Sequence, residues 1–169
     1  MNDWLPPLCL FQDFENDWQK YENHLYSRFR RDFIISPPRV AGQPVQINSA
    51  PYQKGKEEGF WHLITEEQEV ERDGRLQRER LPDFRRCERI GWPGAILRHG
   101  EGERVVVWRE RRPDGLRLVH ALSDFSYIVA LAVRGGGKLF LATAFPVELP
   151  WRRDRLRKQY ERYLRTAEP

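Results

Sequence analysis

The sequence is poor in cysteine and has no long apolar run, and both absences narrow the classes of protein it can belong to. Its two cysteines, Cys9 and Cys87, form neither a CxxC pair nor a disulfide framework, so a reduced, cytosolic protein is expected. The first residues carry no basic segment, and Pro6-Pro7 interrupts their apolar run, which argues against a signal peptide. The longest apolar run, residues 127–133, is too short to span a bilayer. We therefore expect a soluble, cytoplasmic protein without a membrane partner.

Motifs for nucleotides, metals and covalent catalysis are also missing. No GxGxxG or GxxxxGK[ST] pattern occurs, and the glycines of residues 135–137 join two predicted strands, which argues against a parallel nucleotide-binding fold. The four histidines lie in separate segments without HExxH spacing, so neither a metal nor another cofactor is expected. No GxSxG pattern marks a serine hydrolase.

The sequence does contain much charge, at 32% of residues, and enough apolar side chains, at 40%, to form a core. The formal net charge is only +4, but seven Lys and Arg residues against two acidic ones stand between Trp151 and Arg165. The positive charge is therefore a feature of the C-terminal segment. Such a cluster fits phosphate binding, an acidic partner or a solvated surface.

Apolar residues at helical spacing predict one long amphipathic helix from residue 13 to about residue 35, carried by Phe14, Trp18, Tyr21, Leu25, Phe29 and Phe33. Ser36-Pro37-Pro38 ends this helix, and residues 36–59 are predicted to be a loop with a short strand at 44–47. A second helix is predicted for DFRRCERI, residues 83–90, and a basic third helix after Pro150.

After residue 93 the pattern changes to that of β-strands. Five segments are β-branched, aromatic or alternating, namely residues 95–98, 104–112, 116–123, 125–134 and 138–147. The turns between them are short, and turns of this length join only antiparallel neighbours. Helices, an antiparallel sheet of four or five strands and a last helix together predict the α+β fold class.

Histidine is the side chain that titrates near neutral pH, so each of the four histidines is a candidate for proton transfer. His24 and His99 lie in charged or turn-like segments and are expected to be solvated. His120 shares strand parity with three leucines and is predicted to face the core. His62 lies in the middle of FWHLIT, between bulky apolar side chains. A core histidine and a proton-transfer residue both fit that setting.

RNA cleavage without a metal needs a base for the 2′-hydroxyl, an acid for the leaving oxygen and fixed cations for the charge at phosphorus. Arginine suits the last task, because its planar fork matches phosphate oxygens and keeps its charge. Thr143 shares strand parity with Leu139 and Leu141, and fits a structural and a site role equally well. Taken one by one, most basic residues fit a solvated face better; the candidates for a site are Arg86, Arg89, Arg109, Lys138, Arg152, Arg153, Arg155 and Arg157.

Taken together, GKEEGFWHLIT, LPDFRRCERIGW, a strand with Trp108, YIVALAVR, and FLATAFPVE before a basic helix resemble phage- and mobile-element-associated proteins of the barnase–EndoU–colicin–RelE superfamily. The similarity spans roughly residues 40–165. It implies a twisted antiparallel sheet packed against N-terminal helices, with an active site on an open face. It also implies a helical arm, residues 1–39, and a nuclease domain, residues 40–169.

The activity that the resemblance implies is metal-independent cleavage of RNA by 2′-hydroxyl attack, leaving a 2′,3′-cyclic phosphate. The implied catalytic set is His62, as general acid or base, with Arg86, Arg89 and Thr143. The implied RNA-binding set is Arg109, Lys138, Arg152, Arg153, Arg155 and Arg157.

The second proton-transfer group is left open, with Glu88 and Glu110 as candidates. The predicted partners are RNA, with tRNA among the candidates, and an acidic antitoxin or immunity protein, because many members of the superfamily are toxins. Two alternatives remain: a non-catalytic RNA-binding module, and an interaction protein whose basic helix docks an acidic partner.

Overall fold

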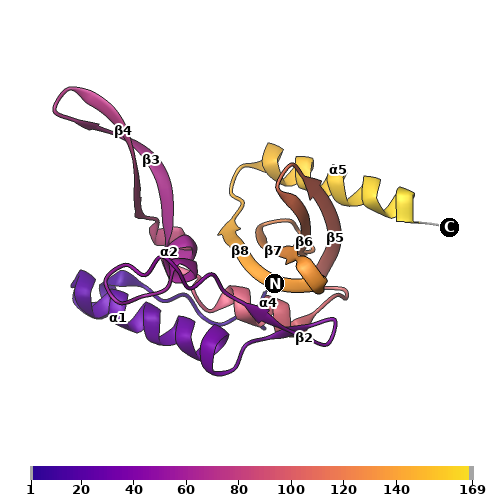
Figure 1. The fold of residues 1–169 in the computed structure, drawn as a ribbon, viewed down its shortest axis with the longest axis horizontal. Coiled ribbons are helices and arrows are strands. Elements are labelled where there is room, and N and C mark those ends of the chain that lie inside the picture. The colour runs from indigo at the N-terminus through magenta and orange to yellow at the C-terminus, as the bar shows by residue number, and fades with distance from the viewer. Residues whose placement is uncertain (1, 168–169) are drawn as a thin grey trace.

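The computed structural model describes residues 2–167 as an α+β protein with a curled sheet (Figure 1). Met1 and residues 168–169, the last two of the predicted nuclease domain, lie outside the described range. The α-helices are α1 Trp18–Phe29, α2 Glu58–Ile64, α3 Phe84–Glu88, α4 Trp92–His99 and α5 Pro150–Ala167. The strands are β1 Arg39–Val40, β2 Gln43–Gln46, β3 Thr65–Arg72, β4 Arg75–Pro82, β5 Val105–Arg112, β6 Gly115–Leu122, β7 Tyr127–Arg134 and β8 Lys138–Pro146. Among these residues, no helix combines the length and apolar character needed to cross a membrane.

Strands β5 to β8 form the antiparallel meander that their short turns predicted. The sheet is larger than predicted, because β1 and β2 extend it to six strands in the order β1-β2-β8-β7-β6-β5. β2 pairs with β8 in parallel, with Val45 opposite Leu139. The sheet is therefore mixed, and the prediction of a purely antiparallel sheet of four or five strands was wrong. A parallel pair needs a long connection, and α2 to α4 lie between these two strands in the chain.

Residues 95–98, predicted as the first strand of the sheet, lie in helix α4 instead. Pro93 stands in the first turn of α4, where its fixed φ suits a helix and its missing N–H is not needed. Pro93, Ile96 and Leu97 are buried, and their spacing is that of one helix face. An apolar run of three residues does not distinguish a strand from a buried helix, which is why this prediction failed.

The predicted N-terminal helix, residues 13–35, is divided in three. A 3-10 turn, Phe11–Phe14, precedes α1, and a π-helical segment, Arg30–Ile35, follows it. Glu15 and Asn16 interrupt the helix with φ values of 58° and 55°. These two residues redirect the chain before α1 begins.

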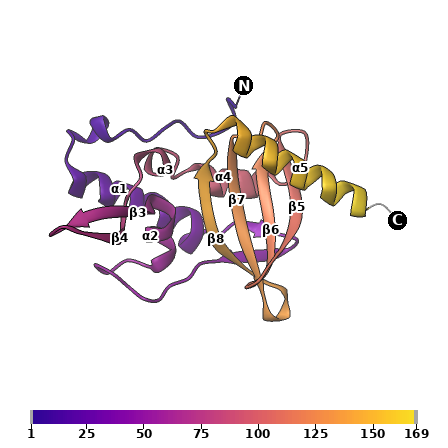
Figure 2. The same ribbon diagram turned by 90° about the horizontal axis from the view of Figure 1, so that it is seen from above.

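Two hydrophobic cores lie on opposite faces of the sheet, because successive side chains of a strand point to opposite sides. The larger core packs helices α1 to α4 against one face and includes Phe29 and Leu131. Residues of the predicted helical arm thus share a core with the sheet. The smaller core, around Trp108 and Phe125, is covered by α5 through Tyr160 and its neighbours. Figure 2 shows α5 crossing the strands diagonally.

Strands β3 and β4 form a separate two-stranded hairpin that projects from the body (Figures 1 and 2). Its turn, Asp73-Gly74, has φ values of 51° and 74°, as a type I′ turn requires. Arg72 and Glu79 pair across the hairpin at 2.9 Å. The turn was recognisable in the sequence, but the two charged strands beside it were not predicted. At its base the hairpin places Arg80 beside α2.

His120 is buried on the face of the sheet that bears the larger core, as predicted, with 2% of its surface exposed. Its Nδ1 has no hydrogen-bond partner within residues 2–167. Burial lowers the pKa of this imidazole from 6.5 to about 4. The unfolded chain therefore takes up this proton more readily than the folded one. The resulting stability is fully present above pH 6.5 and is lost as the pH falls from 6.5 toward 4.

We expect His120 alone to lower the free energy of unfolding by roughly 2 kcal/mol between pH 7.5 and pH 5. His120→Leu cannot titrate, so this part of the pH dependence should be absent from it. Urea unfolding at the two pH values measures the difference. His24→Leu, at an exposed position of α1, is the matched control and should keep the wild-type dependence. Equal pH dependence in His120→Leu and wild type would contradict this assignment.

Candidate functional site

His62 lies on the exposed side of α2, near its C-terminal end. Phe60, Leu63 and Ile64 of the same helix are buried in the larger core, and they fix the orientation of α2. The side chain of His62 remains 39% exposed. Solvent and ligands therefore reach its imidazole.

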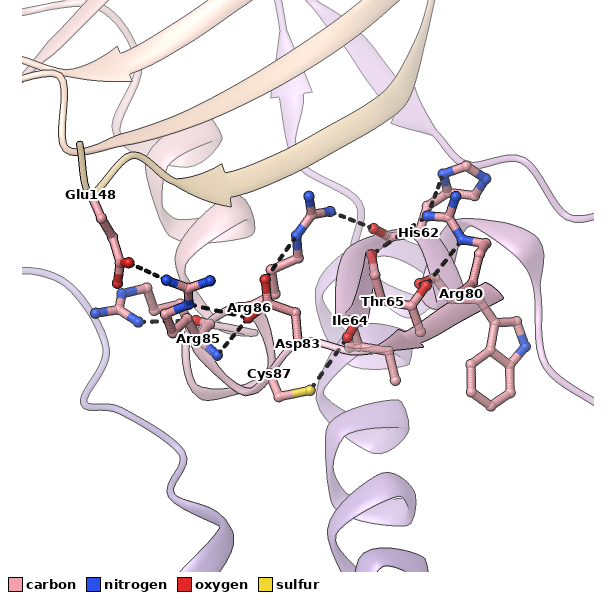
Figure 3. Close-up of polar contacts among 11 residues, drawn as sticks. His62, Ile64, Thr65, Arg80, Asp83, Arg85, Arg86, Cys87 and Glu148 are labelled. Carbon is pink, nitrogen blue, oxygen red and sulfur yellow. Dashed lines mark hydrogen bonds and ion pairs between the residues drawn. The ribbon is translucent and has the colours of Figure 1, made fainter. Parts of the chain in front are cut away.

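Both ring nitrogens of His62 contact charged groups. Nε2 lies 3.2 Å from Oε1 of Glu58, one turn earlier in α2, and Nδ1 lies 3.4 Å from Nη2 of Arg80 in β4. A guanidinium can only donate, so Nδ1 is the acceptor and Nε2 carries the proton toward Glu58. Figure 3 shows Arg80 against the imidazole. The imidazole of His62 thus lies between a carboxylate and a guanidinium.

Thr65, at the junction of α2 and β3, holds Arg80 in place. Its Oγ1 donates to the carbonyl oxygen of Trp61 at 2.5 Å and accepts from Nε of Arg80 at 3.1 Å. Thr65 also pairs in register with Pro82 at the base of the hairpin. The hairpin base and the end of α2 therefore place a fixed cation beside His62.

Arg86, a predicted cation of the site, contacts the main chain of His62. Its Nη1 donates to the carbonyl oxygen of His62 at 3.3 Å, and its Nε lies 3.7 Å from Asp83 (Figure 3). The guanidinium also lies over the Phe145 ring, at 5.3 Å. Burial lowers the pKa of Arg86, while Glu66 and Asp83 oppose that shift. Because arginine keeps its charge, Arg86 is a partly dehydrated cation close to the end of α2.

Arg89, the second cation predicted for the site, makes its contacts in α3 and α4 instead. Its guanidinium lies over the Trp92 ring at 5.1 Å and donates to the carbonyl oxygen of Arg85 at 3.0 Å. Glu88, an open candidate for the second proton-transfer group, lies 3.7 Å from Arg89. Both residues therefore contact groups of α3 and α4, and neither contacts His62.

Thr143 lies on the face of β8 opposite to the one its parity predicted. The pairing of β7 with β8 shifts by one residue at Ala142, which forms a β-bulge. Leu139 and Leu141 are therefore buried in the larger core, whereas Thr143 lines a cavity of about 500 Å³ between the sheet and α5. Within residues 2–167 no hydrogen bond joins Thr143 to His62.

Two predicted RNA-binding residues lie elsewhere on the sheet. Arg109 is exposed on β5 and borders a surface hollow with Arg162 and Tyr163 of α5. Lys138 is exposed at the start of β8, in register with Arg134. The structure therefore distributes the predicted basic residues over several surfaces.

The four arginines of α5 that were predicted to bind RNA fall into two groups. Arg153 donates from Nε to the carbonyl oxygen of Val147 at 2.6 Å, and Arg157 pairs with a carboxylate of its own helix at 3.0 Å. Arg152 and Arg155 line the cavity of about 500 Å³ instead. Neither of these two has an ion-pair partner in the part of the chain that the structure describes. Arg153 and Arg157 thus support the helix, and Arg152 and Arg155 are available to a ligand.

No family model, curated protein or solved structure matches this chain. Membership of the barnase–EndoU–colicin–RelE superfamily therefore stays a prediction from sequence fragments. No group of three or more His, Cys, Asp or Glu side chains among residues 2–167 is arranged to hold a metal ion. The roles of the site residues rest on geometry alone.

Two residues that contact His62 were not identified from the sequence. Glu58 precedes His62 by four residues, a spacing that places both on one face of a helix. Arg80 was missed because the hairpin was not predicted. The Asp73-Gly74 turn was the available signal, since a two-residue turn fixes the register of both strands and so places Arg80 opposite Glu67.

Proposed function

We propose that this protein is a metal-independent endoribonuclease of the barnase–EndoU–colicin–RelE superfamily, in which His62 transfers a proton. The observation that supports this is the line from Glu58 through the exposed imidazole of His62 to Arg80. A carboxylate behind a histidine orients the ring and stabilises the imidazolium that forms when the ring takes a proton. A guanidinium beside the ring is a ligand for phosphate.

In the proposed reaction, an RNA phosphate draws Arg80 away from His62, because a charged oxygen is a stronger acceptor than a neutral ring nitrogen. Nδ1 of His62 is then free to take the proton of a 2′-hydroxyl. The 2′-oxygen bonds to phosphorus, and the bond from phosphorus to the 5′-oxygen breaks. The 5′-oxygen takes a proton from a second acid or from water. Arg80 and the nearby charge of Arg86 stabilise the negative phosphorane oxygens.

Incubation of the purified protein with total RNA in EDTA tests the proposal. Fragments with 2′,3′-cyclic phosphate ends are expected, because His62 and the two arginines supply the proton transfer and the positive charge. RNA with 2′-O-methyl groups should stay intact, since it has no nucleophile. A mock preparation from cells that lack the protein controls for contaminating nucleases. Intact RNA, or cleavage that EDTA abolishes, would contradict the proposal.

A second candidate is a non-catalytic RNA-binding module. One contact favours it: Nη2 of Arg80 lies 3.4 Å from Nδ1 of His62, where a 2′-hydroxyl would have to approach the ring. Binding of RNA without cleavage in the same assay would support this alternative. An acidic antitoxin or immunity protein remains a predicted partner, on the basis of the charge of α5.

A further inference from the structure

The cavity between α5 and the sheet has the dimensions of a ligand site. Its volume is about 500 Å³, within the range of pockets that bind small molecules. Strands β5 to β8 form its floor, and α5 crosses above them (Figures 1 and 2). His62 is not among the residues that line it.

The walls of this cavity carry an excess of positive charge, with four arginines and one glutamate. Glu110, the other open candidate for proton transfer, is paired with Arg112 at 3.3 Å, and Arg117 is paired with a carboxylate of the β5–β6 turn at 2.6 Å. Arg152 and Arg155 are exposed and have no such partner within the described residues. Two unpaired cations in the wall of a cavity attract an anion.

Arg152 also stands in the first turn of α5, where cations weaken a helix. The helix begins at Pro150, and its first turn contains no acidic residue. Because the N-terminal end of a helix carries partial positive charge, acidic residues stabilise it and basic residues do not. A bound anion would relieve this repulsion. Departures from a local rule of this kind are expected at functional sites.

Aromatic rings accompany the unpaired arginines. Trp151 is 59% exposed at the rim of the cavity, with the guanidinium of Arg152 over its ring at 5.8 Å. Trp108 lines the cavity as well, and its buried Nε1 is a donor without a partner within residues 2–167. A ligand with a flat ring and a phosphate matches this set, because the ring stacks on an indole and the phosphate pairs with arginine.

We infer that this cavity binds one nucleotide unit, with its phosphate between Arg152 and Arg155 and its base against Trp151. The cavity shares Arg152 and Phe145 with a smaller cavity of about 230 Å³, which Arg86 also lines. The proposed nucleotide site is therefore next to Arg86, which contacts the end of α2. Three carboxylates also line the smaller cavity, those of Glu66, Asp83 and Glu148. Binding of a nucleotide in this cavity does not depend on ribonuclease activity. The use of the cavity as a subsite for an RNA substrate does rest on the proposed function.

The test measures tryptophan fluorescence during titration with uridine 5′-monophosphate and with a 2′-O-methyl uridine octamer, which cannot be cleaved. Arg152→Ala/Arg155→Ala is expected to bind the octamer about 100-fold more weakly, because two charge-assisted contacts are lost. The slope of log affinity against log salt should flatten by about 0.7 per phosphate contact. Arg162→Ala/Arg165→Ala removes the same charge from α5 outside the cavity, and should change affinity by no more than about twofold, since such surface charges are screened.

Equal losses in the two double variants would overturn the nucleotide site, and so would equal binding of polyphosphate, which has no bases. Tighter binding of the octamer than of the monophosphate supports a subsite for a strand, and equal binding supports a site for a free nucleotide. If Arg152→Ala/Arg155→Ala fails to fold, Arg155→Gln repeats the comparison. Cleavage is measured separately. If Arg152→Ala/Arg155→Ala alone loses binding but the wild-type protein does not cleave RNA, the ribonuclease proposal is contradicted and the nucleotide site is not. If the wild-type protein cleaves RNA but both double variants lose binding equally, the nucleotide site is contradicted and the ribonuclease proposal is not.

Discussion

Replacing His62 with alanine is expected to slow RNA cleavage by about a hundred- to ten-thousand-fold, the usual effect of removing a general acid or base. The fold should persist, because the imidazole is 39% exposed and its two partners are at the surface, where such contacts contribute little stability. RNA binding should also persist, because Arg80, Arg152 and Arg155 remain in place. The loss is therefore expected in the chemical step.

Single-turnover cleavage and the melting temperature, measured on one preparation of His62→Ala, separate a catalytic role from a structural one. His24→Ala is the matched control, since His24 is an exposed histidine on α1. It should cleave at the wild-type rate. A His62→Ala protein that melts earlier and still cleaves RNA would end the catalytic assignment.

The meander of β5 to β8 was predictable because its turns are local. Turn residues such as Pro113-Asp114 fix both the direction and the register of the strands they join, and these pairings follow the sequence. The pairing of β2 with β8 has no such signal. It depends on where α2 to α4 place the chain, which is a matter of tertiary packing. The six-stranded mixed sheet therefore could not be predicted from local patterns.

Single residues decide where several predicted site residues lie. The bulge at Ala142 moves Thr143 from the core face of β8 to the cavity under α5. The phase of α5 on the sheet separates Arg152 from Arg153, although both are arginines in one basic run. Neither feature follows from residue type. The sequence left a core and a surface position open for His62, because helix α2, whose buried residues fix the orientation of His62, was not predicted. The catalytic role of His62 stays a prediction.

Replacing Trp108 with alanine is expected to lower the free energy of unfolding by about 3–5 kcal/mol, the usual cost of removing a large buried aromatic side chain. Trp108 is 1% exposed and is the largest side chain of the smaller core. Its ring lies 5.9 Å from that of Tyr160 in α5 and 6.2 Å from that of Phe125, measured between centroids. Loss of this ring removes a contact between α5 and the sheet.

Because the two cores lie on opposite faces of the sheet, the effect of Trp108→Ala should be concentrated in α5. Trypsin cleaves after the many arginines of this helix, and cleavage of an opened segment reports the population of the open form. The variant is therefore expected to be cut within residues 152–165 well before the rest of the chain. Trp92→Ala is the matched control, since Trp92 packs on Tyr127 at the larger core, 5.3 Å between ring centroids. It should destabilise the protein without selective cutting of α5. If trypsin cuts α5 equally fast in both variants, the smaller core does not hold this helix on the sheet. The cavity between α5 and the sheet would then not be a stable feature of the protein.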